Sequence, residues 1–581
     1  MDISSHSRRR RSTVRLLGIV LAISMAACTG LVTEPLPETE PSPSVATTTT
    51  SAAAACLTGG PGTAPVATGG RALDAITLSG EVFACAPDVV VVGEASLSEA
   101  VAAAQLAAAL VAPLLLPHPQ LAAELGRLDP ERVHVVGAAV VEPPPGAELV
   151  SHDIPSAIQE ASERLAAPVV EPTDQFSKVV DAVLAMESGA AVVSPDVANA
   201  PVNDVDRLVT GLARPTDGGP VWIVDAADPF TVLLAAAYAT SANASVIPVD
   251  ADDLFRHPEV GESLAGYPDR PVRTVGLAEA PNDWELRTLA RGEQLPGGGF
   301  ELFPDHINRR LVGFYGNPAS PALGAMGQVP PEEALDLMRD GGVLTGYLES
   351  GCFPSPCQGT VQPGLLDGFA ADGATVVPLF NYIGSVAQPR CGTALFPIER
   401  FQDGIDVAGR EGGYVVFDLQ PGSQDFLTQV RAYEPALRLP HVSVGLDPEW
   451  RCAPGQTDFD RIGTVTAAEV NQVIDWLANL VNAEALPQKL LVIQQFRFSM
   501  IQDRDQITER PEVQVLIQMD GEGQGNLSTK DGTWEALIEG TEDDHWRWGW
   551  KNFFVRDHPD GPYTPQQTLD RTPVPVYITY Q

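Results

Sequence analysis

The sequence predicts an α/β protein in which a small repeated β-α-β sheet domain, residues 59–290, precedes a (β/α)8 or TIM barrel, residues 300–581. Two observations predict this fold class. The first half contains two similar strand-helix-strand segments, and the second half alternates strand-like apolar runs with amphipathic helical stretches. Helices that alternate with strands are typical of parallel α/β architectures, and eight such units close into a barrel.

The two segments of the first half align without gaps. They begin at Val89 and Val221, and each contains an apolar strand, an acidic turn, an Ala-rich helix and a second apolar strand. A further short strand ends in Val136-Gly137 in the first copy and in Val275-Gly276 in the second. Continuously apolar strands are typical of parallel sheets that are buried on both faces, so the repeat predicts a small α/β sheet with helices on its faces.

The second half contains the strand-like runs of the barrel. The predicted strands begin near Arg310, Thr375, Tyr414, His441, Lys489, Val513, Arg547 and Pro575. Helical candidates between them are Pro331–Arg339, Ser423–Leu437 and Thr466–Leu486. In the last of these, apolar residues recur every three or four positions, as they do on one face of a helix.

The N-terminus has the pattern of an export signal. Arg8–Arg11 precede an apolar run, Leu16–Ala27, which is too short to cross a bilayer but fits a signal peptide. The run ends in Met25-Ala26-Ala27-Cys28, which resembles the lipobox of bacterial lipoproteins and implies acylation of Cys28. An ordinary secretory signal is the alternative, and both Sec and twin-arginine export stay open. Residues 29–58 are rich in Pro, Thr, Ser and Ala, which predicts a disordered tether.

The composition is strongly acidic, with a net charge of −39 and a pI near 4.4. A surface that binds nucleic acid is basic, so the composition excludes nucleic acid and suits a carbohydrate or protein partner. No G-x-S-x-G elbow or G-x-G-x-x-G turn follows a strand, and we expect no cofactor.

Seven cysteines are present, and six remain once Cys28 is lipidated. Outside the cell an even number favours disulfides, and we expect Cys56 to pair with Cys85, Cys352 with Cys357, and Cys391 with Cys452. The alternative for the second pair is a metal site. Because no histidine lies near that pair, and the histidines of the barrel half fall at strand starts or in loops, we predict no metal ligand.

Strand periodicity predicts which side chains point into the barrel. Successive side chains alternate between the two faces of a strand, and the apolar set in each strand is expected to face the helices. The polar set then points inward at the carboxyl ends of the strands, where barrel enzymes keep their active sites. The predicted catalytic residues are Asp418, Asp447, Glu449 and Asp520, and the predicted substrate-binding residues are Tyr315, Asn381, Gln420, Gln494, Lys551 and Gln581.

Two aromatic and basic features of the barrel have alternative interpretations. Trp546, Trp548 and Trp550 share the strand face opposite Lys551, so packing beneath helices is preferred over sugar stacking. Lys551 allows a Schiff base, but a lysine among carboxylates is more often an ion-pair partner.

The first half resembles the cell wall-binding repeat 2 family. The resemblance covers about residues 70–285 and rests on Leu106-Ala107-Ala108, Pro113–Leu116 and Val135-Val136-Gly137. It implies three repeats that hold anionic wall polymers, with a third copy between about 150 and 215 marked by Ala190–Val193. The alternative is an α/β domain that keeps the fold and has lost the binding.

The second half resembles an uncharacterised family of secreted bacterial barrel proteins. The resemblance covers about residues 308–581 and rests on VGFYGNP, VVPLFNYIGSVA, FDLQPG, VGLDPEW, MDGEG and ITYQ. It implies fold and location only.

A shorter motif, Asp447-Pro448-Glu449, resembles the D-x-E ending of the signature of chitinase-type family 18 glycosidases. That resemblance implies that Glu449 is the general acid and that Asp447 orients the N-acetyl group of the substrate. The earlier acidic residue of the signature is absent, because His441–Val444 occupy its place. Asp418 and Asp520 offer a second route, in which a carboxylate from another strand acts as base or nucleophile.

These observations together predict a lipid-anchored protein on the outer face of the cytoplasmic membrane. Its barrel is expected to act as a glycoside hydrolase on a cell-wall or extracellular glycan, and Cys28 is its contact with the membrane. The alternative is a non-catalytic surface protein whose barrel binds a glycan or a partner protein.

Overall fold

Everything described below belongs to one compact unit, residues 49–581. The computed structural model describes residues 56–58, 70–93, 96–170, 182–183, 186, 192–193, 219–249, 261, 264, 266–267, 269–277, 281–304, 307–347, 357–361, 364–523, 526–541, 545–557 and 562–581. The predicted signal peptide, Cys28 and most of the predicted tether lie outside these residues. Among the described helices, none has the length and apolar character that a membrane span requires.

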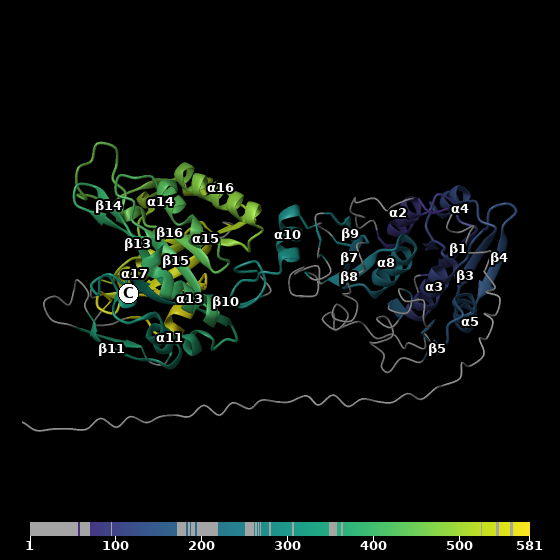
Figure 1. Cartoon of the computed structure of the whole chain (residues 1–581), viewed down its shortest axis with the longest axis horizontal. Helices are drawn as coiled ribbons and strands as arrows, with labels where there is room; N and C mark the ends of the chain where they lie inside the picture. Colours follow the sequence, from purple (N-terminus) through teal and green to yellow (C-terminus); the bar gives the residue numbers. More distant parts are fainter. Residues whose placement is uncertain are drawn as a thin grey trace, which may run out of the picture. The chain divides into compact units, whose positions relative to one another are not determined.

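Both predicted repeat units are present in the first half (Figure 1). The first consists of α2 (Arg71–Val82), β1 (Asp88–Val92), α3 (Leu97–Leu110), β2 (Leu114–Leu115), α4 (Leu121–Leu128), β3 (Arg132–Val136), β4 (Glu148–His152) and α5 (Ile154–Leu165). The second consists of β7 (Val221–Asp225), α8 (Pro229–Ala242), β8 (Ser245–Val249) and β9 (Val272–Val275). Their parallel sheets have the orders β2-β1-β3-β4 and β8-β7-β9, so β1 and β7 occupy equivalent places.

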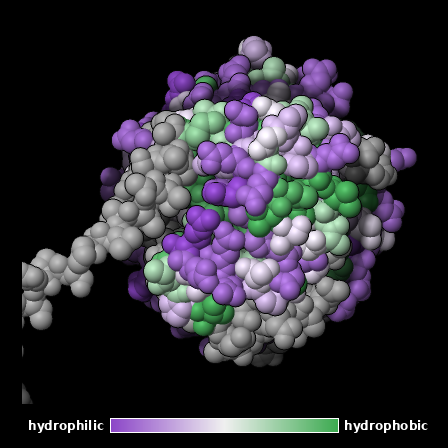
Figure 2. Space-filling view, turned by 90° about the vertical axis from the view of Figure 1, so that its right-hand side faces the viewer, coloured by the Kyte–Doolittle hydropathy of each residue, from purple (hydrophilic) through white to green (hydrophobic). Residues whose placement is uncertain are grey.

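The Ala-rich helices α3 and α8 form the centre of this region. They pack against each other and are buried over most of their length, as is typical of helices that are apolar on all sides. A third parallel pair, β5 (Val169–Val170) with β6 (Val192–Val193), lies in the stretch where a third copy was expected. Most of residues 171–218 lies outside the described residues, so the third copy stays a prediction. Figure 2 shows mostly hydrophilic side chains around an apolar band on one face of the molecule.

The second half is a closed barrel of eight parallel strands, as predicted. The strands are β10 (Arg309–Gly316), β13 (Thr375–Gln388), β15 (Tyr414–Leu419), β16 (Val442–Leu446), β18 (Lys489–Gln495), β20 (Val513–Met519), β21 (Arg547–Asn552) and β22 (Tyr577–Tyr580). They pair in chain order, and the sheet closes where Leu311 of β10 pairs with Tyr577 of β22.

Helices cover the outside of the barrel (Figure 1). They are α11 (Pro331–Asp340), α12 (Leu365–Phe369), α13 (Gln402–Glu411), α14 (Phe426–Ala432), α15 (Glu434–Leu437), α16 (Ala467–Glu484), α17 (Leu527–Ile538) and α18 (Pro565–Leu569). The predicted helix 423–437 is two helices, because Pro435 lacks the N–H that a continuous helix requires. Two short 3-10 turns, η4 (Phe498–Met500) and η5 (Arg504–Gln506), replace a covering α-helix between β18 and β20.

The second half also contains smaller elements before the barrel and in its loops. They are the antiparallel pair β11 (Gly342–Tyr347) and β12 (Cys357–Val361), the strand β14 (Gly392–Leu395) paired with β13, the parallel pair β17 (Val465–Thr466) and β19 (Ile501–Gln502), the turns η1 (Ala325–Gly327), η2 (Ile398–Phe401) and η3 (Pro448–Trp450), and α10 (Asp283–Arg291) before the barrel. The segment that precedes β10 also belongs to the barrel core, because Leu295, Leu302 and Phe303 join its interior cluster. The barrel core therefore begins a few residues before the predicted boundary at 300.

The side-chain parity of the strands is as predicted. Val442, Val444 and Leu446 of β16 join the hydrophobic cluster formed with the surrounding helices. The interior cluster consists of the alternate residues, among them Leu379, Tyr414, Val416, Leu490, Val492, Leu516 and Tyr577. The lower and middle parts of the interior are therefore packed and largely apolar, which leaves the carboxyl ends of the strands for polar side chains.

Two of the three predicted disulfides are present. Cys56 pairs with Cys85, and Cys391 pairs with Cys452, which joins the hairpin after β13 to the loop after β16. The third predicted pair includes Cys352, which lies outside the described residues.

Candidate functional site

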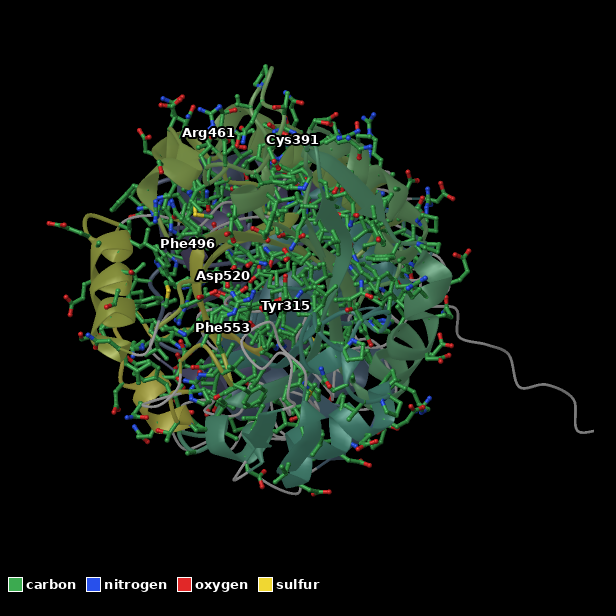
Figure 3. The ribbon with its side chains drawn as sticks, turned by 90° about the vertical axis from the view of Figure 1, so that its left-hand side faces the viewer. Tyr315, Cys391, Arg461, Phe496, Asp520 and Phe553 are labelled. Atoms are coloured by element: carbon green, nitrogen blue, oxygen red, sulfur yellow. A yellow bond between two sulfur atoms is a disulfide. The ribbon has the colours of Figure 1, made fainter. Side chains whose placement is uncertain are left out.

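Six of the predicted site residues lie together at the carboxyl end of the barrel. They are Tyr315 on β10, Asp418 on β15, Asp447 after β16, Gln494 on β18, Asp520 after β20 and Lys551 on β21, and we call them the mouth cluster. The end-on view of the barrel in Figure 3 shows Tyr315 and Asp520 near its centre, with Phe496 and Phe553 beside them. Strand parity thus gathers side chains from six different strands.

Asp418 is buried and makes hydrogen bonds with two other members of the mouth cluster. Its Oδ2 accepts hydrogen bonds from the Tyr315 hydroxyl and from Gln494 Nε2, each at 2.5 Å. The residue is 1% exposed, and its Oδ1 has no hydrogen-bond partner among the described residues. Burial raises the pKa of Asp418, although Lys551 and the two hydrogen bonds oppose the rise. Asp418 is therefore held rigidly and is hardly accessible to a substrate.

Lys551 supplies the positive charge of the mouth cluster. Its Nζ lies 2.9 Å from Asp520 Oδ1 and 3.6 Å from the centroid of the Tyr315 ring. It also donates to Gln494 Oε1 at 3.4 Å. These contacts give Lys551 the ion-pair role that was preferred over a Schiff base.

Asp447 and Glu449 extend the mouth cluster toward the rim. Asp447 is 3% exposed, and its Oδ1 has no hydrogen-bond partner among the described residues. Burial raises the pKa of Asp447 well above its ordinary value, and the negative charges of Asp418 and Glu449 add to the effect. Glu449, in the turn η3, is half-buried, and burial together with the charge of Asp520 raises its pKa to about 7. Both carboxyl groups thus retain protons well above the ordinary pKa of an acidic side chain.

Backbone contacts fix the turn that carries Glu449. Its carbonyl accepts a hydrogen bond from the Gly463 N–H at 2.7 Å, and the Trp450 carbonyl accepts one from Gly422 at 3.1 Å. A Cβ at Gly463 would lie 2.3 Å from the Pro448 carbonyl oxygen, so only glycine allows this approach. The disulfide at Cys452 holds the same loop.

Three predicted substrate-binding residues lie outside the mouth cluster. Asn381 is in the layer below, where it donates to the Val416 carbonyl at 3.2 Å and accepts from the Tyr577 hydroxyl at 2.8 Å. Gln420 turns toward the extension of β13 and accepts from the Ala387 N–H at 2.9 Å. Gln581 follows β22 at the same end of the barrel, and its Cγ lies close to Gly324.

The periodicity argument missed a second buried ion pair, behind the mouth cluster. Lys530 on α17 pairs with Asp557 at 2.6 Å, and both side chains are 0% exposed. Asp557 also accepts from the Gly523 and Phe553 N–H groups, and Lys530 donates to the Lys551 carbonyl. The pair therefore positions the loops that follow Asp520 and Lys551. A signal was present, because Lys530 shares the buried face of α17 with Trp534 and Leu537.

The tryptophans of β21 pack as predicted. Trp548 and Trp550 both meet Trp534 of α17 edge-on with ring centroids 5.5 Å apart, and Trp546 is 5% exposed. These rings are part of the layer between strand and helix and do not face the barrel axis.

Comparisons with known proteins give remote similarities. No protein-family model and no curated protein matches the chain. Among solved structures it is similar to Cwp8 from Clostridium difficile, with 16% identity and a TM-score of 0.31 over 40% of this chain and 51% of that chain. It is also similar to Cwp6 from Clostridium difficile, with 11% identity and a TM-score of 0.33 over 62% of each chain. The chain thus spans less than two thirds of the length of either protein.

Proposed function

We propose that this chain is a lipid-anchored cell-envelope protein, held at Cys28, whose barrel hydrolyses a glycan of the envelope or of the extracellular space. The export signal, the lipobox-like Met25–Cys28 and the acidic composition support the location. The two disulfides are consistent with it, because disulfides persist in oxidising compartments outside the cytoplasm. The cell-wall-binding role of the repeat region is part of the same proposal.

One observation carries the hydrolase proposal. Glu449 lies on the rim with a pKa of about 7, near Asp447 of the same strand end and near Asp418 and Asp520 from two other strand ends. A carboxylic acid that is protonated near neutral pH can donate a proton to the leaving oxygen of a glycosidic bond. Lys551 lies beside Asp520 and favours its ionised form, although burial raises the pKa of Asp520 above its ordinary value. Two carboxyl groups with different environments are what acid-base hydrolysis of a glycoside requires.

Glu449 has the same role in two routes that differ in the second acid. Glu449 donates its proton as the bond to the leaving oxygen breaks, and the resulting carboxylate then takes a proton from the attacking water. In the substrate-assisted route, the N-acetyl carbonyl oxygen attacks the anomeric carbon while Asp447 orients the N-acetyl group. In the second route, Asp520 acts as nucleophile or base from a different strand. Asp418 suits neither task, because hydrogen bonds occupy its Oδ2 and the residue is 1% exposed.

Hydrolysis of defined glycans tests the proposal. The full-length chain is incubated with peptidoglycan strands and with an N-acetylglucosamine polymer, each in N-acetylated and de-N-acetylated form, and new reducing ends are counted. Glu449→Gln should reduce kcat/KM by about 10²–10⁴-fold, the range typical of a lost general acid. Glu333→Gln, which changes an exposed glutamate on α11, is the matched control and should retain full activity.

The remaining variants separate the two routes. Asp520→Asn should abolish turnover only if Asp520 acts directly, and loss of the N-acetyl group should abolish it only in the substrate-assisted route. If the unchanged chain releases no reducing ends from any of these glycans, the hydrolase proposal is wrong. Glycan binding that Glu449→Gln weakens would then support the non-catalytic alternative, which is favoured by the many contacts that mouth-cluster residues make with one another.

A further inference from the structure

Two histidines and a glutamate lie together in the first repeat, far from the barrel in sequence. His134 is on β3 and His152 is the last residue of β4, the neighbouring parallel strand, and Glu160 is on the following helix, α5. In the register of the two strands His152 pairs with Val136, two residues after His134, so both imidazoles lie on one face of the sheet. One nitrogen or oxygen of each of the three residues lies within 4.8 Å of the others.

A carboxylate behind His134 fixes the tautomer of its ring. Asp88 Oδ1 lies 3.0 Å from His134 Nε2, and both Asp88 oxygens also accept from the Arg132 guanidinium, at 2.6 and 2.8 Å. Because the Arg132 pair keeps Asp88 ionised and accepting, Nε2 of His134 carries the proton and donates it to Asp88. The lone pair of His134 Nδ1 is then free and points at His152 Nε2, 3.0 Å away.

Glu160 completes the group from the side of α5. Its Oε2 lies 3.7 Å from His152 Nε2, whereas its Oε1 pairs with Arg164 at 3.1 Å. The Glu160 side chain is 25% exposed, and the two histidine side chains are 2% and 5% exposed. The three atoms are thus enclosed by the sheet on one side and reachable from solvent past Glu160 on the other.

We propose that His134 Nδ1, His152 Nε2 and Glu160 Oε2 bind a divalent transition-metal ion, with Zn²⁺ as the expected occupant and a fourth position open to solvent. Two histidines and one glutamate are a known zinc ligand set. With metal–ligand bonds of about 2.0–2.2 Å, tetrahedral ligand atoms lie about 3.3–3.5 Å apart. Two of the three separations, 3.0 and 3.7 Å, bracket this value, and the third pair of atoms lies within 4.8 Å. Mg²⁺ and Ca²⁺ prefer oxygen ligands, so the two imidazoles select against them.

The surroundings of the three residues agree with this assignment. A carboxylate that accepts the second N–H of a ligating histidine is the usual outer partner in zinc sites, and Asp88 has this place. A hydrogen bond between the two imidazoles alone would account for His134 and His152. A metal ion would account for the convergence of all three atoms, including Glu160 Oε2, which at 3.7 Å from His152 Nε2 is beyond hydrogen-bond distance. The sequence argument considered a metal only at Cys352 and among the barrel histidines, because these three ligands share no short motif.

A bound ion would join three elements of the repeat. It would tie the edge strand β4, whose residues are mostly exposed, to β3 and to α5. Metal binding to the folded state alone stabilises that state by an amount that grows with the free metal concentration. The ion therefore has a structural role that is independent of the reaction proposed for the barrel.

Calorimetric titration of the chelator-treated full-length chain with Zn²⁺ tests the site. We expect one high-affinity site, a rise in the melting temperature on adding Zn²⁺, and the visible absorption of tetrahedral Co²⁺ when cobalt replaces zinc. Glu160→Gln, a partly exposed change that leaves the fold intact, should weaken binding at least 10-fold, and His152→Gln should abolish it. Asp88→Asn, which acts through His134, should weaken binding about 10–100-fold.

Two controls exclude unspecific binding to this acidic chain. His118→Gln changes a histidine of the same region whose Nδ1 accepts only a local backbone hydrogen bond, and it should leave the affinity unchanged. Excess Ca²⁺ should not displace Zn²⁺. The proposal is overturned if the unchanged chain binds no Zn²⁺, if Glu160→Gln binds as tightly as the unchanged chain, or if Ca²⁺ competes on equal terms. Circular dichroism identifies a His152→Gln variant that fails to fold, and Glu160→Gln then decides the question.

Discussion

Replacement of Lys551 by methionine removes the one cation of the mouth cluster while keeping the length of the side chain. Its Nζ pairs with Asp520 at 2.9 Å, and the side chains of the pair are 3% and 8% exposed. Lys551 also lowers the pKa of Asp418, Asp447 and Glu449, because its positive charge stabilises their ionised forms. The variant therefore removes the nearest positive charge from Asp520 and from these three carboxyl groups.

The expected loss of stability depends on pH. Breaking a buried ion pair by removing one partner destabilises a protein by about 3–5 kcal/mol, because the other charge stays buried. Burial already raises the pKa of Asp520 above its ordinary value, and without Lys551 it rises further. A carboxyl group whose pKa is higher in the folded state favours folding at low pH and loses that contribution as the pH rises through the folded value. We expect a loss near 1 kcal/mol at about pH 4.5, rising by up to 1.4 kcal/mol per pH unit toward the full 3–5 kcal/mol at about pH 8.5.

Urea unfolding followed by tryptophan fluorescence measures this difference, because Trp548 and Trp550 lie on the strand that carries Lys551 and pack against Trp534. The double variant Lys551→Met/Asp520→Asn should recover most of the loss at high pH. Arg438→Met, which breaks exposed ion pairs on the barrel, should change the stability by less than about 1 kcal/mol. A loss for Lys551→Met that is the same at both pH values, or a double variant as unstable as the single one, would refute the account of the mouth cluster.

Three further predictions concern the acid, the disulfide and the anchor. If Glu449 is the general acid, kcat/KM for glycan hydrolysis should fall about tenfold per pH unit above its pKa of about 7; a Glu449→Asp variant with an unchanged profile would contradict this assignment. Replacing Cys391 and Cys452 by alanine opens a loop with a sequence separation of 61 and should lower the free energy of unfolding by about 4 kcal/mol in urea denaturation. Cys28→Ser should release the protein from the membrane fraction of expressing cells, and mass spectrometry should find no lipid; retention in the membrane would contradict the lipoprotein assignment.

The fold and much of the mouth cluster could be predicted because strand periodicity is a local property. In β16, apolar Val442, Val444 and Leu446 alternate with polar or small residues, so the burial of one set fixes the direction of the other. All eight strand starts followed from runs of this kind, and the carboxyl ends of parallel strands meet at one end of a barrel.

What could not be predicted depends on contacts between distant segments. Strand periodicity predicted that Asn381 and Gln420 point into the barrel or lie at its rim. Neither joins the mouth cluster, because Asn381 bonds to Tyr577 and Gln420 bonds to Ala387. The Lys530–Asp557 pair links a helix to a loop that has no periodic pattern. The group of His134, His152 and Glu160 depends on strand register, which no single segment of the sequence specifies.

The contrast between the layers of the barrel interior bears on whether the mouth cluster is a site or part of the packing. In the lower layers Leu, Val and Tyr side chains fill the space, and Ser443 and Tyr414 share a hydrogen bond of 2.7 Å. At the carboxyl end, Asp418 Oδ1 and Asp447 Oδ1 are buried without a hydrogen-bond partner among the described residues. Each such group destabilises the folded state by about 1–3 kcal/mol, and apolar side chains of similar size would avoid that penalty. Unpaired buried polar atoms also occur elsewhere in the barrel, as at Arg310 Nε and Gln518 Oε1. At the carboxyl end, however, the unpaired atoms are carboxyl oxygens from neighbouring strand ends, and this grouping is consistent with a site built for a ligand.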